Sequence, residues 1–162
     1  MLEIRRVQPA DTDDLYSIFQ DVIRDGTTFP YRADTSKSDF VTIWLAKGST
    51  VYVAVKGNEI VGSYVIKPLW PGAGSHVAHG SYMVAPLNRG EGIGFALGEH
   101  SLEEARKAGF LAMQFNLVVS SNRSAVKLWQ KLGFLVVGTL PGVFKHPQLG
   151  LIDAYVMHRF LT

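Results

Sequence analysis

The chain has 162 residues, 47% of them hydrophobic and 19% charged, so we expect one globular domain over residues 1–162 and exclude disorder. A formal net charge of +2 excludes the concentrated basicity of a dedicated nucleic-acid binder, although one local basic patch for a phosphorylated ligand is compatible with it. The absence of cysteine excludes disulfides, thiolate nucleophiles and cysteine-ligated metals, and it agrees with a reducing compartment.

The first third of the chain is predicted to form a strand and two helices. Alternating residues predict a strand over 2–7, and Asp11 is a good N-cap for the helix that follows. That helix has one apolar stripe at i, i+3, i+4, i+7 and i+8, formed by Leu15, Ile18, Phe19, Val22 and Ile23. A loop over 26–34 contains aromatic side chains that can line a pocket, and residues 36–46 are predicted as a second, weaker helix.

Strands and helices alternate over the rest of the chain. Residues 51–55 and 60–66 are predicted to form a hairpin, because the Gly57-Asn58 pair between them suits a tight turn. Further elements are expected as strands at about 77–85, 111–119, 134–139 and 151–160, with helices at about 92–108 and 122–132.

The third and fourth of these helices lie between strands. The connection from the strand at 77–85 to the strand at 111–119 is long enough for a right-handed crossover, which makes the two strands parallel. The predicted fold class is therefore α/β (mixed, α+β type), with a mostly antiparallel sheet of about seven strands, one parallel pair and four helices.

No segment has the character of a signal peptide or a membrane span. The start, MLEIRRVQPAD, contains no apolar run, and no later stretch approaches the ~18 consecutive apolar residues that cross a bilayer. We therefore expect a cytoplasmic protein, with neither membrane nor nucleic acid as a partner.

The segment Arg89-Gly90-Glu91-Gly92-Ile93-Gly94 lies between a predicted strand and a predicted helix. Its glycines permit a tight turn and leave N–H groups unpaired at a helix N-terminus, where the helix dipole favours phosphate. Arg89 can add a fixed charge. The alternative is a turn built only for tight packing. The spacing fits neither the dinucleotide fingerprint GxGxxG nor a P-loop, which ends in Gly-Lys-Ser/Thr.

Two motifs in the chain resemble the GCN5-related N-acetyltransferases. Residues 89–94 match that family's pyrophosphate loop, Arg/Gln-x-x-Gly-x-Gly/Ala, which follows its fourth strand. The segment from Asn122 to Phe134 is similar to the family's Asn-x-x-Ala-x-x-Leu-Tyr-x-x-x-Gly-Phe block after the fifth strand, with Trp129 in place of the tyrosine. The order of elements over 2–160 also agrees, so the resemblance covers nearly the whole chain.

The resemblance implies acetyl-coenzyme A as a co-substrate, a splayed sheet and no metal. The implied cofactor contacts come from the backbone of Tyr82, Met83 and Val84 for the pantetheine arm, from Arg89, Gly90, Glu91, Gly92, Ile93, Gly94 and Phe95 for the pyrophosphate, and from Asn122 for the arm. Physical reasoning agrees, because parallel strands that splay apart leave edge donors that an extended amide ligand can complete. Asn122 is alternatively a plain helix N-cap, and both roles are compatible.

Acetyl transfer to an amine needs a neutral amine, a polarised thioester and a proton for the departing thiolate. His79 stands where relatives that resemble phosphinothricin acetyltransferases carry a carboxylate thought to deprotonate the amine, and imidazole with a pKa near ~6.5 can do the same. His76 is the competing base. For either residue the alternative is a histidine that only makes structural hydrogen bonds.

Trp129 departs from the family pattern, because indole cannot protonate a thiolate as tyrosine can. We expect it to pack with the apolar residues on the same helix face, which are Ala125, Leu128 and Leu132. The thiolate then takes its proton from water or from the hydroxyl of Tyr82, Tyr155 or Ser124, and the sequence does not choose among them.

Asn116 is a polar residue inside the apolar strand at 115–119. Its surroundings look somewhat like those in amino-acid and proline-analogue acetyltransferases, where such an amide can face the substrate carboxylate; the alternative is a structural amide. Arg32, Lys145 and His146 are predicted in loops that flank the acceptor cleft, and each can bind a carboxylate or simply be solvated.

The predicted function is transfer of an acetyl group from acetyl-coenzyme A to the amine of a small molecule, an amino acid or an analogue, by direct attack on the thioester. The alternatives are a protein, peptide or antibiotic N-acetyltransferase and a non-catalytic coenzyme A-binding module, the latter motivated by Trp129. A homodimer through the last strand and the loop at 138–150 is also compatible with the sequence.

Overall fold

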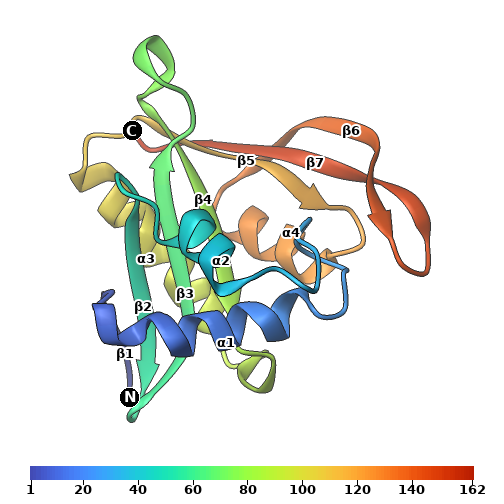
Figure 1. The fold of residues 1–162 in the computed structure, drawn as a ribbon. Coiled ribbons are helices and arrows are strands. Elements are labelled where there is room, and N and C mark those ends of the chain that lie inside the picture. Colours follow the sequence, from blue (N-terminus) through green and yellow to red (C-terminus); the bar gives the residue numbers. More distant parts are fainter.

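A computed structural model describes all residues from 1 to 162. Seven strands form one sheet in the order β1-β2-β3-β4-β5-β7-β6 (Figure 1). The strands are β1 Leu2–Arg6, β2 Thr50–Lys56, β3 Glu59–Pro68, β4 Val77–Val84, β5 Ala112–Val119, β6 Leu135–His146 and β7 Gly150–Phe160. The helices are α1 Thr12–Ile23, α2 Lys37–Trp44, α3 Ile93–Lys107 and α4 Arg123–Lys131, with short 3-10 turns at Pro9–Asp11, Gly72–Gly74 and Pro86–Asn88.

Every neighbouring strand pair is antiparallel except β4 and β5, which are parallel and connected through α3. This pattern confirms the predicted fold class, including the crossover helix and the numbers of strands and helices. The turn between β2 and β3 lies at Gly57-Asn58 as predicted, and Gly57 has a positive φ of 64°.

Two apolar clusters lie on the two faces of the sheet. The stripe of α1 packs with Phe40 and Trp44 of α2 and with Val53 of the sheet, while Tyr64 and Met113 face the opposite way and pack with α3 and α4. The separation follows from the alternation of side chains along each strand. Figure 1 shows α1 and α2 in front of the β1–β4 half of the sheet.

The helix starts are close to those predicted from the sequence. Asp11 is at the N-cap of α1, but its side chain accepts hydrogen bonds from Arg5 and from the backbone N–H of Gln8 instead of capping the helix. Ser36 caps α2 by accepting from the N–H of Asp39. None of the helices has both the length and the apolar character that a membrane crossing requires.

β6 is longer than the sequence predicts. We expected a strand at 134–139 followed by a loop, whereas the strand continues to His146 and the loop before β7 is short. Pro141 and Gly142 are typical of a loop, yet here they lie at a register shift between Leu140 and Phe144 in an edge strand. An edge strand tolerates proline because one side of its backbone has no partner strand.

β4 and β5 pair over only three residues each, Val77 to His79 with Ala112 to Gln114. Beyond that point β5 stays paired with β7 and the two parallel strands diverge, as the view of Figure 1 shows. The register of β5 with β7 also shifts between Phe115 and Val118, so that Asn116 and Leu117 together oppose a single residue of β7. The result is a V-shaped opening whose apex lies at His79 and Gln114.

Candidate functional site

The open edge of β4 is one wall of the candidate site. Hydrogen bonds from Leu69 N to Val77 O and from Ala85 N to Val61 O, both 2.8 Å, show that odd-numbered residues of β4 pair with β3. The backbone groups of Tyr82 and Val84 therefore face the side from which β5 has diverged. Met83 was predicted to offer its backbone as well, but its N–H and C=O are directed to β3.

The glycine-rich loop is the second wall. Gly90 and Gly92 both have a φ of +80°, which favours glycine, and Gly92 is the N-cap of α3. None of the six backbone N–H groups from residue 90 to residue 95 donates a hydrogen bond within the protein. Six free amides in succession at a helix start form a concentrated set of donors for an anion.

Small residues bring the following helices close to this loop. A Cβ on Gly94 would lie 3.1 Å from Leu128 Cδ1, and one on Gly98 would overlap Leu132 Cδ1. Glycine at these positions thus lets α4 pack against the first turns of α3, which places the start of α4 beside the free amides.

Of the two charged residues in the loop, Glu91 has an ionic partner and Arg89 has none. Arg89 is exposed and takes part in no ion pair. Glu91 is bound by Lys56, with 2.7 Å between Nζ and Oε2, and this hydrogen bond lowers the pKa of Glu91. The negative charge of Glu91 is thus compensated, and Arg89 is left as an unpaired cation at the loop.

Asn122 has the geometry of a helix N-cap. Its Oδ1 accepts from the N–H of Ala125 at 3.4 Å and from Ser124 Oγ at 3.2 Å, while its Nδ2 has no partner in the protein. The predicted cap is confirmed, and Nδ2 remains a free donor for the predicted contact with a cofactor. Arg89 and Asn122 line the same hollow of about 240 Å³.

His79 lies at the apex of the V, on the face of the sheet opposite α3. It is half-buried, and burial together with the charge of Lys67 lowers the pKa of its imidazole. The ring is therefore neutral near pH 7 and can accept a proton. His76, the competing base, is exposed and precedes β4. The catalytic role of His79 stays a prediction.

A row of polar side chains crosses the sheet at the apex. Lys67, His79, Gln114 and His158 are successive register partners on β3, β4, β5 and β7, so their side chains share one face. Gln114 Nε2 donates to Asn116 Oδ1 at 2.8 Å. This hydrogen bond holds Asn116 beside Gln114, the register partner of His79, and leaves the Nδ2 of Asn116 without a partner.

Trp129 is a core residue, as expected. It is 8% exposed, and its ring centroid lies 4.5 Å from that of Phe115 and 4.6 Å from that of Tyr82. The Tyr82 hydroxyl is bonded to Ser101 Oγ at 2.7 Å and to Met113 Sδ at 3.3 Å, and burial raises its pKa. Tyr82 is therefore a poor proton donor to a ligand in the V, which leaves water, Tyr155 and Ser124.

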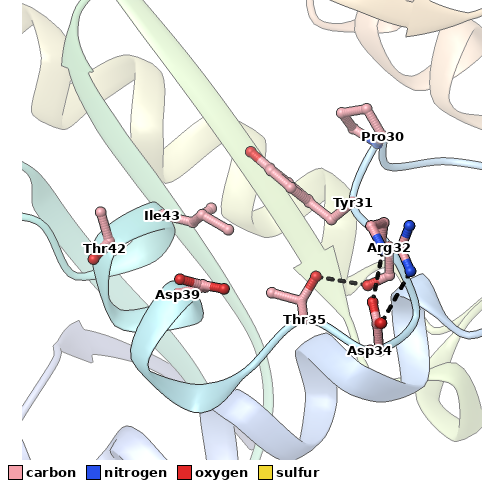
Figure 2. A pocket seen from close by; sticks show the side chains of 8 residues that line it. All are labelled: Pro30, Tyr31, Arg32, Asp34, Thr35, Asp39, Thr42 and Ile43. Atoms are coloured by element: carbon pink, nitrogen blue, oxygen red, sulfur yellow. Dashed lines mark hydrogen bonds and ion pairs between the residues drawn. The ribbon is translucent and has the colours of Figure 1, made fainter.

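Arg32 lies in a different place, a hollow of about 580 Å³ between the 26–35 loop and α2 (Figure 2). Its guanidinium donates two hydrogen bonds of 2.9 and 3.0 Å to the carboxylate of Asp34, and this pairing lowers the pKa of Asp34. Asp39 lines the same hollow. A ligand carboxylate would have to compete with Asp34 there, so the structure weakens the case for Arg32 as its binding residue.

Several residues near the V were missed in the sequence. Gln114 and His158 are brought to the apex by strand registers that no local pattern reveals. One local signal was present, because Gln114 and Asn116 are polar residues at i and i+2 of an apolar strand and so lie on one face. Thr27, Thr28 and Ser121 gave no signal, because only the fold brings them to Arg89 and Asn122. No group of three or more His, Cys, Asp or Glu side chains is arranged to hold a metal ion.

Comparison with known proteins places these features in a family. The profile of the acetyltransferase (GNAT) family matches residues 13–134. A solved GCN5-related N-acetyltransferase from Kribbella flavida is 39% identical, covers 98% of this chain and 97% of its own, and superimposes with a TM-score of 0.94.

Two further similarities are more distant. N-acetyltransferase aca1 of Schizosaccharomyces pombe is 36% identical over 101 residues, which are 61% of this chain but only 48% of that protein, so the match spans about half of the relative's length. A phosphinothricin acetyltransferase from Sinorhizobium meliloti, solved in complex with acetyl-coenzyme A, has a TM-score of 0.86 at 19% identity and covers 98% of this chain and 88% of its own. At that identity the likeness shows the fold alone.

Proposed function

The chain belongs to the acetyltransferase (GNAT) family, and from that premise we propose that it transfers the acetyl group of acetyl-coenzyme A to the amine of a small molecule, an amino acid or a close analogue. The observation that carries the donor half of this proposal is the run of free amides from residue 90 to residue 95. Pyrophosphate is the ligand that such a helix start, with Arg89 beside it, binds best.

The open edge of β4 supports the same donor. An extended chain of amides, as in pantetheine, can pair with the backbone groups of Val84 and Tyr82 and so continue along β4 in the way a further strand would. A donor that enters at the free amides and follows this edge ends at the apex of the V, beside His79. Backbone pairing along an extended arm also fixes the direction in which its thioester end points.

The chemistry at the apex is acyl transfer by direct attack. His79 accepts the proton that the amine loses, the amine nitrogen forms a bond to the acetyl carbon, and the bond from that carbon to sulfur breaks. The thiolate takes a proton from water, Tyr155 or Ser124. A histidine whose pKa is lowered by burial and by Lys67 suits the base, because it stays neutral until the pH falls below its ordinary range.

The acceptor face favours a small polar molecule over a basic peptide. The groups next to His79 are the amides of Gln114 and Asn116, the imidazole of His158 and the ammonium of Lys67, and none of the register partners in this row is acidic. A cleft that selects lysine-rich tails would need carboxylates. Neutral amides and cations suit an acceptor that carries its own carboxylate.

Thiol release from acetyl-coenzyme A, measured against a panel of free amino acids, polyamines, aminoglycosides and peptides, tests the proposal. We expect acceptor-dependent release with one or more amino acids. Release only with peptides or aminoglycosides would assign a different acceptor class. Tight binding of acetyl-coenzyme A without release for any acceptor would instead identify a non-catalytic coenzyme A-binding module.

A further inference from the structure

We propose that Trp129, together with the rings of Tyr82 and Phe115, restricts the donor to short acyl groups. These three side chains form an aromatic platform that closes the V on the side of α3. The inference rests on the proposed function, because it assumes a thioester that reaches the apex along β4. It gives Trp129 a part in the choice of acyl group, in addition to its packing in the core.

The aromatic platform bridges β4 and β5 where their backbones have separated. Tyr82 lies three residues after His79, the last residue of β4 that pairs with β5, and Phe115 directly follows Gln114, the last paired residue of β5. The ring centroids of Tyr82 and Phe115 are 5.7 Å apart, and that of Trp129 lies 4.6 Å from the first and 4.5 Å from the second. Aromatic side chains therefore fill the α3 side of the opening between the strands.

The ring of Tyr82 extends the aromatic platform back to the apex. A Cβ on Gly80, the residue after His79, would lie 2.8 Å from the Tyr82 hydroxyl oxygen and 2.9 Å from Cε2, so this ring covers Gly80 on the α3 side. The hydroxyl is held by Ser101 Oγ at 2.7 Å and by Met113 Sδ at 3.3 Å. Tyr82 is thus fixed beside the point where the strands part.

Trp129 is held in place by neighbours behind it. A Cβ on Gly98 would lie 3.3 Å from Trp129 Cζ3, so the indole packs directly against α3. The ring of Phe134 is 1% exposed, and its centroid lies 5.7 Å from that of Trp129. A close-packed interior resists displacement of one side chain, because the surrounding side chains would have to move with it. The aromatic platform is therefore a fixed wall of the V.

The proposed base and the aromatic platform lie on opposite faces of the sheet at the apex. His79 and Tyr82 are three positions apart on β4, so their side chains point to opposite sides. A thioester at the apex lies between them. An acyl chain that extends toward α3 meets the aromatic platform, and one that extends toward His79 occupies the path of the attacking amine.

An acetyl group avoids both obstacles, because only one methyl group lies beyond its carbonyl. The same bonds form and break for every acyl donor, since the amine nitrogen bonds to the acyl carbon and the bond from that carbon to sulfur breaks. Selection at the aromatic platform thus depends on the length of the acyl chain.

The test measures calorimetric Kd values for acetyl-, propionyl- and butyryl-coenzyme A without an acceptor. Trp129→Leu should lower the ratio of the butyryl Kd to the acetyl Kd about fifteenfold, which corresponds to about 0.8 kcal/mol for each of the two added methylenes that enter the vacated space. Trp129→Phe vacates less space and should lower the ratio about fourfold, the equivalent of one methylene.

Phe134→Leu is the matched control, because it removes a ring from the same cluster on the side of Trp129 away from Tyr82. It should leave the ratio of Kd values unchanged. Urea denaturation establishes that each variant is folded, and Trp129→Phe decides alone if Trp129→Leu does not fold. A ratio that is unchanged in the folded Trp129 variants, or that falls equally in Phe134→Leu, would overturn the inference.

Thiol release from the three donors, measured with the amino acids of the acceptor panel, separates this inference from the proposed function. A lowered Kd ratio in the Trp129 variants, without release from any donor, would retain the aromatic platform as a selector of bound acyl groups and refute the transferase proposal. Acceptor-dependent release with an unchanged Kd ratio would retain the transferase and refute the selector.

Discussion

At the scale of single residues, the proposed chemistry depends on the protonation state of His79. His79 is the last residue of β4 that pairs with β5, so its side chain lies where the sheet opens and between Lys67 and Gln114 on the same face. Burial and the charge of Lys67 both favour its neutral form. The proposed base is therefore ready at neutral pH without a carboxylate partner.

Replacement of His79 by alanine should lower kcat and remove the acidic limb of the pH–rate profile. The acidic limb arises because a protonated imidazole cannot accept a proton. The pKa of His79 lies below the ordinary value for histidine, so the rate falls as the pH drops through that lowered pKa. General base catalysis typically contributes about 10²- to 10⁴-fold, which sets the expected loss. Steady-state rates between pH 5 and 9 check this, and an unchanged profile would exclude His79 as the base.

Replacement of Lys67 by methionine should move the same limb to higher pH. The lysine charge lowers the pKa of His79, so its removal raises that pKa and the imidazole becomes protonated earlier as the pH falls. The pH of the limb reports this shift separately from the maximal rate, so a loss of attraction between Lys67 and the acceptor does not obscure it. Lys67→Arg keeps the charge and is the control; a shift of equal size in that variant would contradict the electrostatic explanation.

At the scale of elements, the start of α3 combines a requirement for glycine conformations with the proposed binding of pyrophosphate. Gly90 and Gly92 both need a positive φ, yet a Cβ on either would meet no atom within 4 Å. Steric crowding therefore does not require glycine at these two positions. The positive φ requires it, and this backbone conformation directs consecutive N–H groups to one place.

Gly92→Ala should weaken the binding of coenzyme A. An L-residue in the left-handed region costs about 1–2 kcal/mol, so the loop is expected to relax and to lose the alignment of its free amides. Calorimetric Kd values should rise about five- to thirtyfold, the equivalent of that free energy. Gly48 also has a positive φ, of 89°, but it lies in the loop between α2 and β2. Gly48→Ala imposes the same strain there and should leave the Kd unchanged.

Gly62→Ala should destabilise the packing of β3 against β4 and α3. A Cβ there would lie 2.9 Å from the backbone oxygen of Met83 and 3.1 Å from Leu97 Cδ1, so backbone atoms would have to move. Overpacking of this kind costs about 1–3 kcal/mol of unfolding free energy. Urea denaturation measures the loss. In Gly138→Ala the new Cβ meets only Val156 Cβ at 4.0 Å, and stability should be nearly unaffected.

At the scale of the whole molecule, the sheet ends in an edge that is apolar and exposed. β6 has no neighbour on one side, and Figure 1 shows the β6–β7 hairpin extending away from the helices. Exposed apolar side chains on this hairpin include Leu135, Val137, Val143, Leu151 and Phe160. Unpaired strand edges and apolar patches favour association with another chain.

We expect a second copy of the chain to cover this hairpin. Leu151 is 71% exposed at the start of β7, and Leu151→Lys places a charge inside the expected contact. Sedimentation equilibrium should give a dimer for the unmodified chain and a weaker dimer for the variant. Leu87→Lys, at another exposed leucine outside the hairpin, is the control. A monomer at all concentrations would contradict the expectation.

Most of the fold was predictable because its signals are local. The stripe of α1, the Gly57-Asn58 turn and the crossover after β4 each follow from a short stretch of sequence. The length of β6 was not predictable, because Pro141 is typical of a loop unless the strand is known to be an edge.

The candidate site was predictable in part, for a similar reason. The loop at 89–94 is continuous in sequence, so its helix start and free amides could be anticipated. The pairing of Arg32 with Asp34, the partners of the Tyr82 hydroxyl and the buried hydroxyl of Thr28 depend on how distant segments pack. No pattern within one segment contains that information.

The register shift in β5 has a consequence for how this family of sequences can vary in length. Met113 and Phe115 face the α3 side before the shift and Val118 does so after it, so the strand changes phase between odd and even positions. Deletion of one residue at Asn116 or Leu117 would therefore remove the bulge without turning the side chains on either side of it, because the residues now at 115 and 118 would be two positions apart on a regular strand. It would move the start of α4 one residue closer to Gln114, whereas a deletion of the same size in the turn at 147–149 would leave that spacing unchanged.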